Sequence, residues 1–208
     1  MLRVMKFGGT SVGTAAAIGR TVEILVEGRD AGVAQVAVVS AMGGVTNLLL
    51  AEAESAAQGD RESATRLREG LRQRHFAAID ELVKSEETRQ RSRAAIDDLS
   101  ERCGRLLESV HVLRDLSTRS SDLIVSFGER MSSVIVAAAL EQRGVRSANV
   151  DSDRVIVTDD SFGSANPLLE PTRAQAAKVL RPLLDDGVLP VVTGFFGASE
   201  SGATTTLG

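Results

Sequence analysis

Aromatic residues are scarce in this chain: its 208 residues include six phenylalanines and no tyrosine or tryptophan. A core must therefore be built mainly from alanine, valine, leucine and isoleucine. The same scarcity removes the usual platforms for stacking nucleic-acid bases, and no block of lysine and arginine replaces them. Because the net charge is −4 and both signs are interspersed, we expect no binding to nucleic acid.

Cysteine is almost absent too, since Cys103 is the only one. An internal disulfide is excluded, which fits a reducing, cytoplasmic environment. Cys103 lies in a helical stretch, where we expect a small, half-buried apolar residue rather than a nucleophile. The sequence has no signal-peptide pattern at its start and no apolar run of the ~18–20 residues that span a bilayer. We therefore expect no membrane association.

Apolar segments and glycines alternate along the rest of the chain as they do in α/β proteins. Residues 2–7 form an apolar run that ends at a glycine pair, and residues 33–39 are almost continuously apolar. A run of the second kind is typical of a parallel strand buried on both faces. Further strands are expected over residues 145–150, 155–157 and 188–193, and helices over residues 12–27, 47–57, 119–142 and 171–184. This order predicts an α/β fold with a mostly parallel sheet.

One long segment, residues 60–118, breaks this alternation. It is rich in arginine, glutamate, glutamine and alanine, with leucine and isoleucine at helical intervals. The pattern predicts two or three amphipathic helices that form a hairpin-like insertion. For His75 and His111, which lie in this segment, we expect a surface or packing role.

The first strand is followed by a turn that could bind an anion. Gly8 and Gly9 let the backbone approach a ligand closely, and amides at the start of the next helix favour negative charge. Thr10 could donate a hydroxyl or cap the helix, and Lys6 could place a positive charge beside phosphate oxygens. The alternative is a plain strand–turn–helix connection. The sequence matches neither the Walker pattern nor the dinucleotide fingerprint.

Two other strands end in similar turns. Ser40 is followed by a glycine pair and then by Thr46 at a helix start, which would form a second anion-binding turn or only a helix cap. Residues 194–197 form a third turn, and the three threonines of residues 204–206 could close over a ligand. In open α/β sheets, ligands bind at the carboxyl ends of strands, where these turns lie.

A helical segment adds charge near these turns. Gly128 in a helix interior costs about 1 kcal/mol relative to alanine, which suggests that something passes close to the backbone there. Glu129 could bind the ammonium group of a substrate. The alternative is that Glu129 and Arg130 are ordinary surface charges, and the local sequence alone favours it.

Together, six segments resemble the ordered signatures of the aspartate kinases; they are residues 6–12, 39–49, 126–130, 157–165, 192–197 and 204–208. The resemblance implies a three-layer αβα sandwich of the amino-acid kinase type. It implies transfer of the γ-phosphoryl group of ATP to the β-carboxylate of L-aspartate. That reaction is the first step toward lysine, threonine and methionine.

The resemblance also implies roles for particular residues. The catalytic residue would be Lys6, and the ATP phosphates would be held by Lys6, Phe7, Gly8, Gly9 and Thr10. The aspartate would be bound by Ser40, Thr46 and Glu129, with Glu129 holding its ammonium group. Mg²⁺ would come bound to the nucleotide, and no separate metal site is expected in the protein.

The chain departs from the family pattern at Gly208, where aspartate kinases continue with an Arg-Gly-Gly-Ser/Thr-Asp segment. Residues 1–208 would then be the amino-terminal portion of a catalytic domain that is truncated at its carboxyl end. The nucleotide lobe and the regulatory ACT domains would lie beyond it. We expect weak ATP binding and little turnover from these residues alone, and a homo-oligomer for the full-length protein.

Two alternatives remain open. The chain could be a non-catalytic binding module that pairs with a partner chain, which a stop codon directly after Gly208 would favour. It could also be another amino-acid kinase, acting on glutamate or carbamate.

Overall fold

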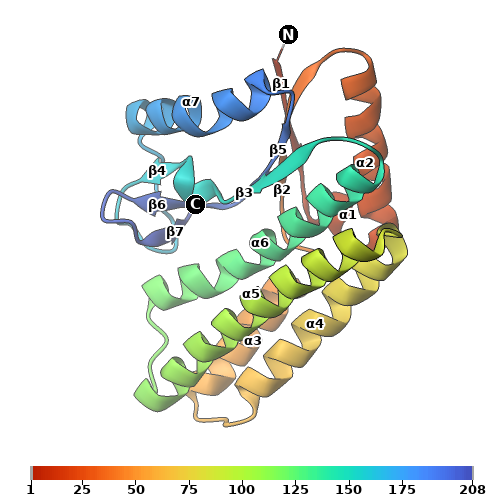
Figure 1. The fold of residues 1–208 in the computed structure, drawn as a ribbon. Helices are drawn as coiled ribbons and strands as arrows, with labels where there is room; N and C mark the ends of the chain where they lie inside the picture. Colours follow the sequence, from red (N-terminus) through yellow and green to blue (C-terminus); the bar gives the residue numbers. More distant parts are fainter. Residues whose placement is uncertain (1, 208) are drawn as a thin grey trace.

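A parallel four-stranded sheet forms the centre of the molecule (Figure 1). The structure is a computed structural model that describes residues 2–207. The strands, in their spatial order, are β1 (Leu2–Phe7), β2 (Ala34–Val39), β5 (Leu189–Thr193) and β3 (Ser147–Val150). All three pairings are parallel, so the four carboxyl ends meet at one edge. The α/β fold with a mostly parallel sheet is confirmed.

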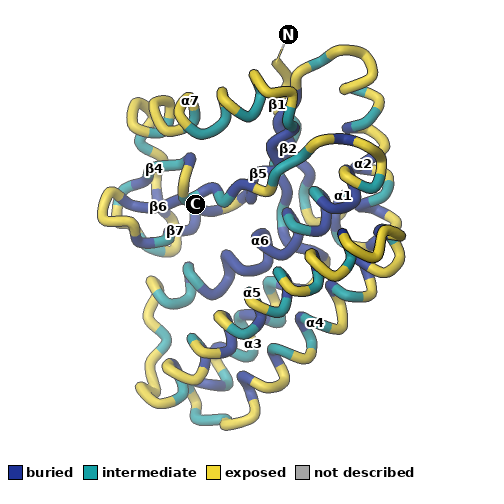
Figure 2. The backbone as a smooth tube through the Cα atoms, viewed as in Figure 1, coloured by how far each residue is buried: buried dark blue, intermediate teal, exposed yellow. Residues whose placement is uncertain are grey.

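Helices cover both faces of this sheet. On one face, α2 (Ala15–Asp30) and α6 (Thr118–Gln142) share the main core with Ala37 and Val39 of β2. On the other face, α7 (Leu169–Asp185) packs on a smaller cluster that includes Val36, Val150, Val155 and Val192. The alternation along β2 separates the two cores, as expected for a strand with both faces covered. The structure therefore has the expected three αβα layers, although no residue of α7 is fully buried (Figure 2).

The helical insertion is also confirmed. α4 (Ser63–Leu82) and α5 (Glu86–Leu113) are joined by a short connection and pack against each other as a hairpin. They form a bundle with α3 (Val45–Ala57) and α6 below the sheet (Figure 1). Fully buried leucines and isoleucines line its interior: Leu67, Leu71, Ile79, Ile96 and Leu107. The charged faces of α4 and α5 are linked by surface ion pairs such as Arg72 with Asp97.

A second, smaller sheet corrects one sequence prediction. It contains β4 (Val157–Thr158), β6 (Phe196–Ser199) and β7 (Thr204–Thr206), with β7 antiparallel to β6. The three threonines, which could have formed a loop that closes over a ligand, are therefore a strand, and Thr205 and Thr206 are buried. β-Branched residues favour strands, and the Thr205 hydroxyl is 2.6 Å from that of Thr158.

Several boundaries differ from the predictions. The expected helix over residues 12–27 is two helices, α1 (Gly9–Val12) and α2. Thr14 caps α2, since its hydroxyl accepts a hydrogen bond from the amide of Ala17 at 3.2 Å. The expected strand at 155–157 begins instead at Val157, because the short 3₁₀ helix Ser152–Arg154 turns the chain first.

The longest apolar helix, α6, is a core helix. By length and composition it is the one described helix that could cross a membrane, although its sequence contains no long run of uninterrupted apolar residues. However, 83% of its most apolar window is buried inside the protein. Figure 2 shows α6 running as a buried element between the sheet and the other helices. Its hydrophobicity is explained by packing on two sides.

His75 and Cys103 are structural residues. The ring of His75 is fully buried, its Nδ1 lies 2.7 Å from the Leu71 carbonyl, and burial lowers its pKa to about 4. Cys103 is fully rather than half buried, and burial raises the pKa of its thiol to about 12. A packing role for His75 is confirmed, and Cys103 has no reactive thiolate at neutral pH.

Gly128 shows why α6 needs a glycine in its interior. A Cβ built at this position would lie 2.8 Å from the Cβ of Ala41 and 3.3 Å from Val45. The close approach expected from the sequence is therefore made by the turn that follows β2. In contrast, a Cβ at Gly19 in α2 would lie 3.8 Å from Leu82, an ordinary contact.

These two glycines provide a matched pair of substitutions. Gly128→Ala should lower the free energy of unfolding by about 1–3 kcal/mol, because the added methyl group overpacks the contact. Gly19→Ala should raise it by up to about 1 kcal/mol, because alanine favours a helix where space allows. Urea denaturation of both variants would test this. A Gly128→Ala protein as stable as Gly19→Ala would show that the contact at Ala41 is not tight.

Candidate active site

The carboxyl ends of the central strands place three turns side by side. The amide of Ser40 donates to the carbonyl of Phe7 at 3.0 Å, and the amide of Gly194 donates to that of Val39 at 2.8 Å. The Ser152 amide donates to the Thr193 hydroxyl at 2.7 Å, which joins the end of β3 to the same edge. The turns that the sequence marked as candidates after β1, β2 and β5 are thus adjacent.

The glycine turn after β1 leaves its backbone accessible. The Gly8 carbonyl accepts from the amides of Ser11 and Val12, so the amides of Gly9 and Thr10 precede the first intrahelical bonds. A Cβ at Gly8 would meet no protein atom within 4 Å, and one at Gly9 would lie 3.8 Å from the Ala41 carbonyl. Protein packing therefore does not require these glycines. The cap of α1 is Gly8, with no side-chain hydrogen bond, so Thr10 is not the cap.

Lys6 and Phe7 point to opposite faces of the sheet. The side chain of Phe7 is buried in the main core, so it packs against the protein. The carbonyl of Phe7 accepts the hydrogen bond from the Ser40 amide. Lys6 pairs in register with Val38, on the face that carries α7, and it is exposed. It has no hydrogen bond or ion pair with any residue in the described range 2–207. The structure places Lys6 at the expected edge without bringing its ammonium group into contact with Glu129.

Glu129 is buried, with 4% of its surface exposed, so its interpretation as a surface charge is wrong. Its Oε1 accepts a hydrogen bond from the Ala41 amide at 3.2 Å. Its Oε2 is buried and has no partner within the part of the chain that the structure describes. Burial raises the pKa of Glu129 to about 7, against the opposing effect of the amide hydrogen bonds. A buried acceptor without a donor is costly and is suited to bind a cation or donor of a ligand.

Arg130 is also buried, with 7% exposure, and does not neutralise Glu129. Its guanidinium group pairs with Asp151, contacts Asp153 at 2.7 Å and lies 4.7 Å from the ring centre of Phe196. These contacts join α6 to the end of β3 and to the second sheet. One sequence feature points to this pairing, because Asp151 and Asp153 directly follow a predicted strand. Their partner, Arg130, lies in a different element, so the sequence does not show which cation they bind.

Asp122 is a buried carboxylate whose positioning role the sequence did not reveal. It is buried on α6 and accepts from the amides of Gly163 at 2.8 Å and Thr206 at 3.0 Å, and from the Thr206 hydroxyl at 2.7 Å. One carboxylate thus connects the loop after β4 and the strand β7 to the helix that carries Glu129. Nothing in the local sequence separates Asp122 from a solvent-exposed aspartate.

Ser40 and Thr46 lie near Glu129. Ser40 directly precedes Ala41, whose amide donates to the Glu129 carboxylate. Ser40 and Thr46 are both half-buried. Thr46 is in the first turn of α3, beside Val45, which packs near Gly128. The structure therefore brings Ser40, Thr46, Glu129 and the glycine turn to one region of the sheet edge.

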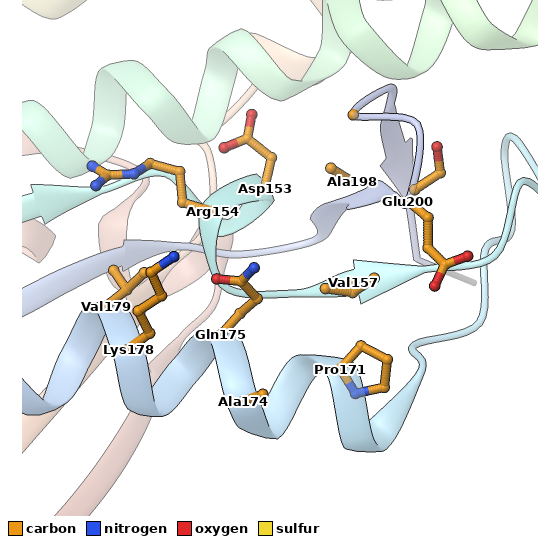
Figure 3. A pocket seen from close by; sticks show the side chains of 12 residues that line it. Asp153, Arg154, Val157, Pro171, Ala174, Gln175, Lys178, Val179, Ala198 and Glu200 are labelled. Atoms are coloured by element: carbon orange, nitrogen blue, oxygen red, sulfur yellow. The ribbon is translucent and has the colours of Figure 1, made fainter.

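A separate cavity of about 660 Å³ lies between α7, β4 and the turn that joins β6 to β7 (Figure 3). Arg154 and Lys178 lie at one end of it and Glu200 at the other. None of the predicted site residues lines this cavity.

The raised pKa of Glu129 makes the stability of the protein depend on pH. Between the ordinary value of 4.5 and about 7, the folded state holds a proton that the unfolded state has lost. The contribution of Glu129 to the free energy of unfolding is therefore complete below pH 4.5 and is lost as the pH rises through about 7. The wild-type protein should lose about 2 kcal/mol from this group between pH 5.5 and 8.

Glu129→Gln should remove this loss, since glutamine can accept the same hydrogen bond and does not titrate. Urea denaturation at pH 5.5 and 8 would measure the effect, with Glu54→Gln on the exposed face of α3 as the control. If both variants keep the wild-type pH dependence, Glu129 is ionised in the folded state throughout this range.

Comparison with known proteins identifies the family of this chain. The model of the amino acid kinase family matches residues 1–208. Lysine-sensitive aspartokinase 3 of Escherichia coli K12 is 34% identical over 99% of this chain, and chloroplastic aspartokinase 1 of Arabidopsis thaliana is 31% identical over 99%. The chain spans 43% and 35% of their lengths.

Comparison with solved structures also points to the aspartokinases. E. coli aspartokinase III, solved with lysine and aspartate and also with aspartate and ADP, superposes with a TM-score of 0.87 in both states. It matches 100% of this chain and 44% of its own length, at 34% identity. The chain belongs to the amino acid kinase family.

Proposed function

We propose that this chain takes part in the phosphorylation of the β-carboxylate of L-aspartate by ATP. The observation that carries the proposal is Glu129, a buried carboxylate with an unpartnered oxygen beside the turn after β2. The aspartokinases among its relatives, and the E. coli structure bound to aspartate and ADP, support the choice of substrate and nucleotide. Because the chain spans less than half the length of those relatives, the activity is proposed for the full-length protein.

Glu129 would bind the ammonium group of aspartate. A cation at Oε2 would supply the missing partner and favour the ionised form of the carboxyl group. The hydroxyl groups of Ser40 and Thr46 are at the same edge and would hydrogen-bond to the substrate. The three residues thus provide one charged and two neutral contacts for a small amino acid.

The glycine turn would receive the phosphates. The amides of Gly9 and Thr10 are free of intrahelical acceptors, and Lys6 carries an unpaired charge at the same strand end. The described residues contain no group of three acidic, histidine or cysteine side chains that could hold a metal ion. Mg²⁺ would instead arrive bound to the nucleotide phosphates and would neutralise part of their charge.

The chemistry then needs positioning rather than a base. The β-carboxylate is ionised at neutral pH, so one of its oxygens can bond to the γ-phosphorus while the bond to the bridging oxygen of ADP breaks. Negative charge moves toward that bridging oxygen, and Lys6 with the turn amides would stabilise it. No proton has to be transferred in this step.

Three further features belong to the same proposal. Residues 1–208 would be the amino-terminal portion of the catalytic domain. The full-length protein would be a homo-oligomer located in the cytoplasm. These expectations rest on the likeness to aspartate kinases and on the absence of a disulfide-forming cysteine pair.

Lys6→Ala tests the role of the phosphate turn. In the full-length protein, kcat should fall by at least ~10²-fold, the effect of removing one preorganised donor. Aspartate-dependent ADP release, with hydroxylamine trapping of the acyl phosphate, measures the reaction. Arg3→Ala, a change of another exposed cation on β1, is the control and should leave kcat unchanged. Normal turnover by Lys6→Ala would exclude the assigned role.

Glu129→Gln tests the substrate site itself. The KM for aspartate should rise at least ~30-fold, because the ammonium group would lose a buried charged partner. Calorimetry at pH 6 in buffers of different ionisation enthalpy should show that aspartate binding releases up to about one proton from the wild type, since the bound cation lowers the pKa of Glu129. The variant should release none. Equal proton release by both proteins would place the ammonium group elsewhere.

A further inference from the structure

The turn that carries two of the proposed substrate residues contains an exposed glycine pair. The turn runs from Ser40 to Thr46, and its middle residues are Gly43 and Gly44. Gly44 has a φ of +77° and is the N-cap of α3, where it provides no side-chain hydrogen bond. Because glycine has more backbone freedom than any other residue, contacts from other elements are needed to hold the pair in one conformation.

Two such contacts hold the pair. The amide of Gly43 donates to the Gly13 carbonyl at 3.2 Å, which ties the turn to the end of α1. The guanidinium group of Arg74, on α4, donates to the Gly43 carbonyl. The same guanidinium group covers Gly44, since a Cβ built there would lie 3.1 Å from Nη1 of Arg74. Both backbone polar groups of Gly43 are thus engaged by other elements.

Arg74 differs from the other arginines of its helix. Arg66, Arg68 and Arg72 each form ion pairs with acidic side chains. Arg74 forms no ion pair within residues 2–207, and it is exposed beside a cavity of about 640 Å³ that separates α4 from the turn. The polar contact of its guanidinium group is therefore the carbonyl of Gly43.

The charge of Arg74 lies at the amino-terminal end of α3. The helix macrodipole makes that end partly positive, so the helix itself disfavours a cation there. The hydrogen bond to the Gly43 carbonyl offsets this cost, because a charged donor binds more strongly than a neutral one. The position of Arg74 is thus explained by the turn and not by the helix that follows it.

The conformation of the glycine pair determines how the two halves of the turn lie relative to each other. Ser40 and the Ala41 amide precede the pair, and Thr46 follows it. The residues that flank the pair, Met42 and Val45, are both buried in the core. The pair is therefore the segment at which the turn can change shape, and Arg74 binds it there.

We propose that Arg74 is a positioning residue for the aspartate site. Its guanidinium group holds Gly43 in place and thereby keeps Ser40 and Thr46 at the separation that the substrate requires. This inference rests on the proposed function. It gives the helical insertion a part in substrate binding, because α4 provides the residue that fixes the turn.

Arg74→Met in the full-length protein tests this role, because methionine keeps an apolar stem and lacks the donor. The KM for aspartate should rise about fivefold, the effect of losing one hydrogen bond, while the KM for ATP stays within about twofold of the wild type. Arg74→Lys keeps a charged donor and should stay within about twofold of the wild type for both substrates. An unchanged KM for aspartate in Arg74→Met, or an equal rise in Arg74→Lys, would overturn the inference.

Arg72→Met is the matched control, since it removes two ion pairs between α4 and α5 and leaves the turn untouched. It should leave the KM for aspartate unchanged. Hydrogen exchange of the amides of residues 40–47, measured by mass spectrometry on the free full-length protein, should be about fivefold faster in Arg74→Met and unchanged in Arg72→Met. Equal effects of the two substitutions would indicate a general loosening of the insertion and would contradict the assigned role.

The exchange measurement separates this inference from the proposed function. If the wild type shows no aspartate-dependent ADP release, the proposed function is excluded, whereas faster exchange in Arg74→Met would still support the contact with the turn. If the wild type is active and exchange in Arg74→Met is unchanged, only the inference is excluded.

Discussion

The contact between α6 and the turn after β2 determines the arrangement of the whole site. Gly128 lets the helix approach Ala41 so closely that a methyl group at this position would collide with it. That approach brings the carboxylate of the next residue, Glu129, to the amide of Ala41 at 3.2 Å. A larger residue at position 128 would move the carboxylate away from the sheet edge. A packing constraint thus sets the position of a charged group, although the constraint itself involves only apolar atoms.

α6 is also fixed at two other places, and both use charged residues. Asp122, seven residues before Glu129 in the sequence, accepts hydrogen bonds from the amides of Gly163 and Thr206. Arg130 binds the two aspartates after β3 and lies over the ring of Phe196. The second sheet therefore has a defined position relative to the helix. The amide of Leu207, directly after β7, also donates to the Phe195 carbonyl, so the turn after β5 is tied to the same sheet. Buried ion pairs add little net stability, so their contribution here is better described as placement.

The sequence predicts the elements of this fold well where the signal is local. The apolar run over residues 33–39, the glycine turn and the amphipathic pattern of α4 and α5 each depend on neighbouring residues, and the structure confirms them. Burial of Glu129 and Arg130 could not be predicted, because a charged helical residue has no local mark that separates a buried site from a solvated face. Their partners lie directly after β3, in the second sheet and in the turn after β2. The burial of the β7 threonines could not be predicted for the same reason, since their partners Thr158 and Asp122 are distant in sequence.

The stability of the free protein and its affinity for a cationic ligand are opposed at Glu129. The unpartnered oxygen and the raised pKa mean that the folded state bears the cost of a buried carboxyl group. A bound ammonium group would remove that cost, and the recovered free energy would appear as affinity for the ligand. A lysine or arginine placed beside Glu129 would stabilise the free protein but would compete with the ligand for the same oxygen. Arg130, the next residue in the sequence, is instead engaged by Asp151 and Asp153, so its charge is already paired and the Glu129 carboxylate stays available.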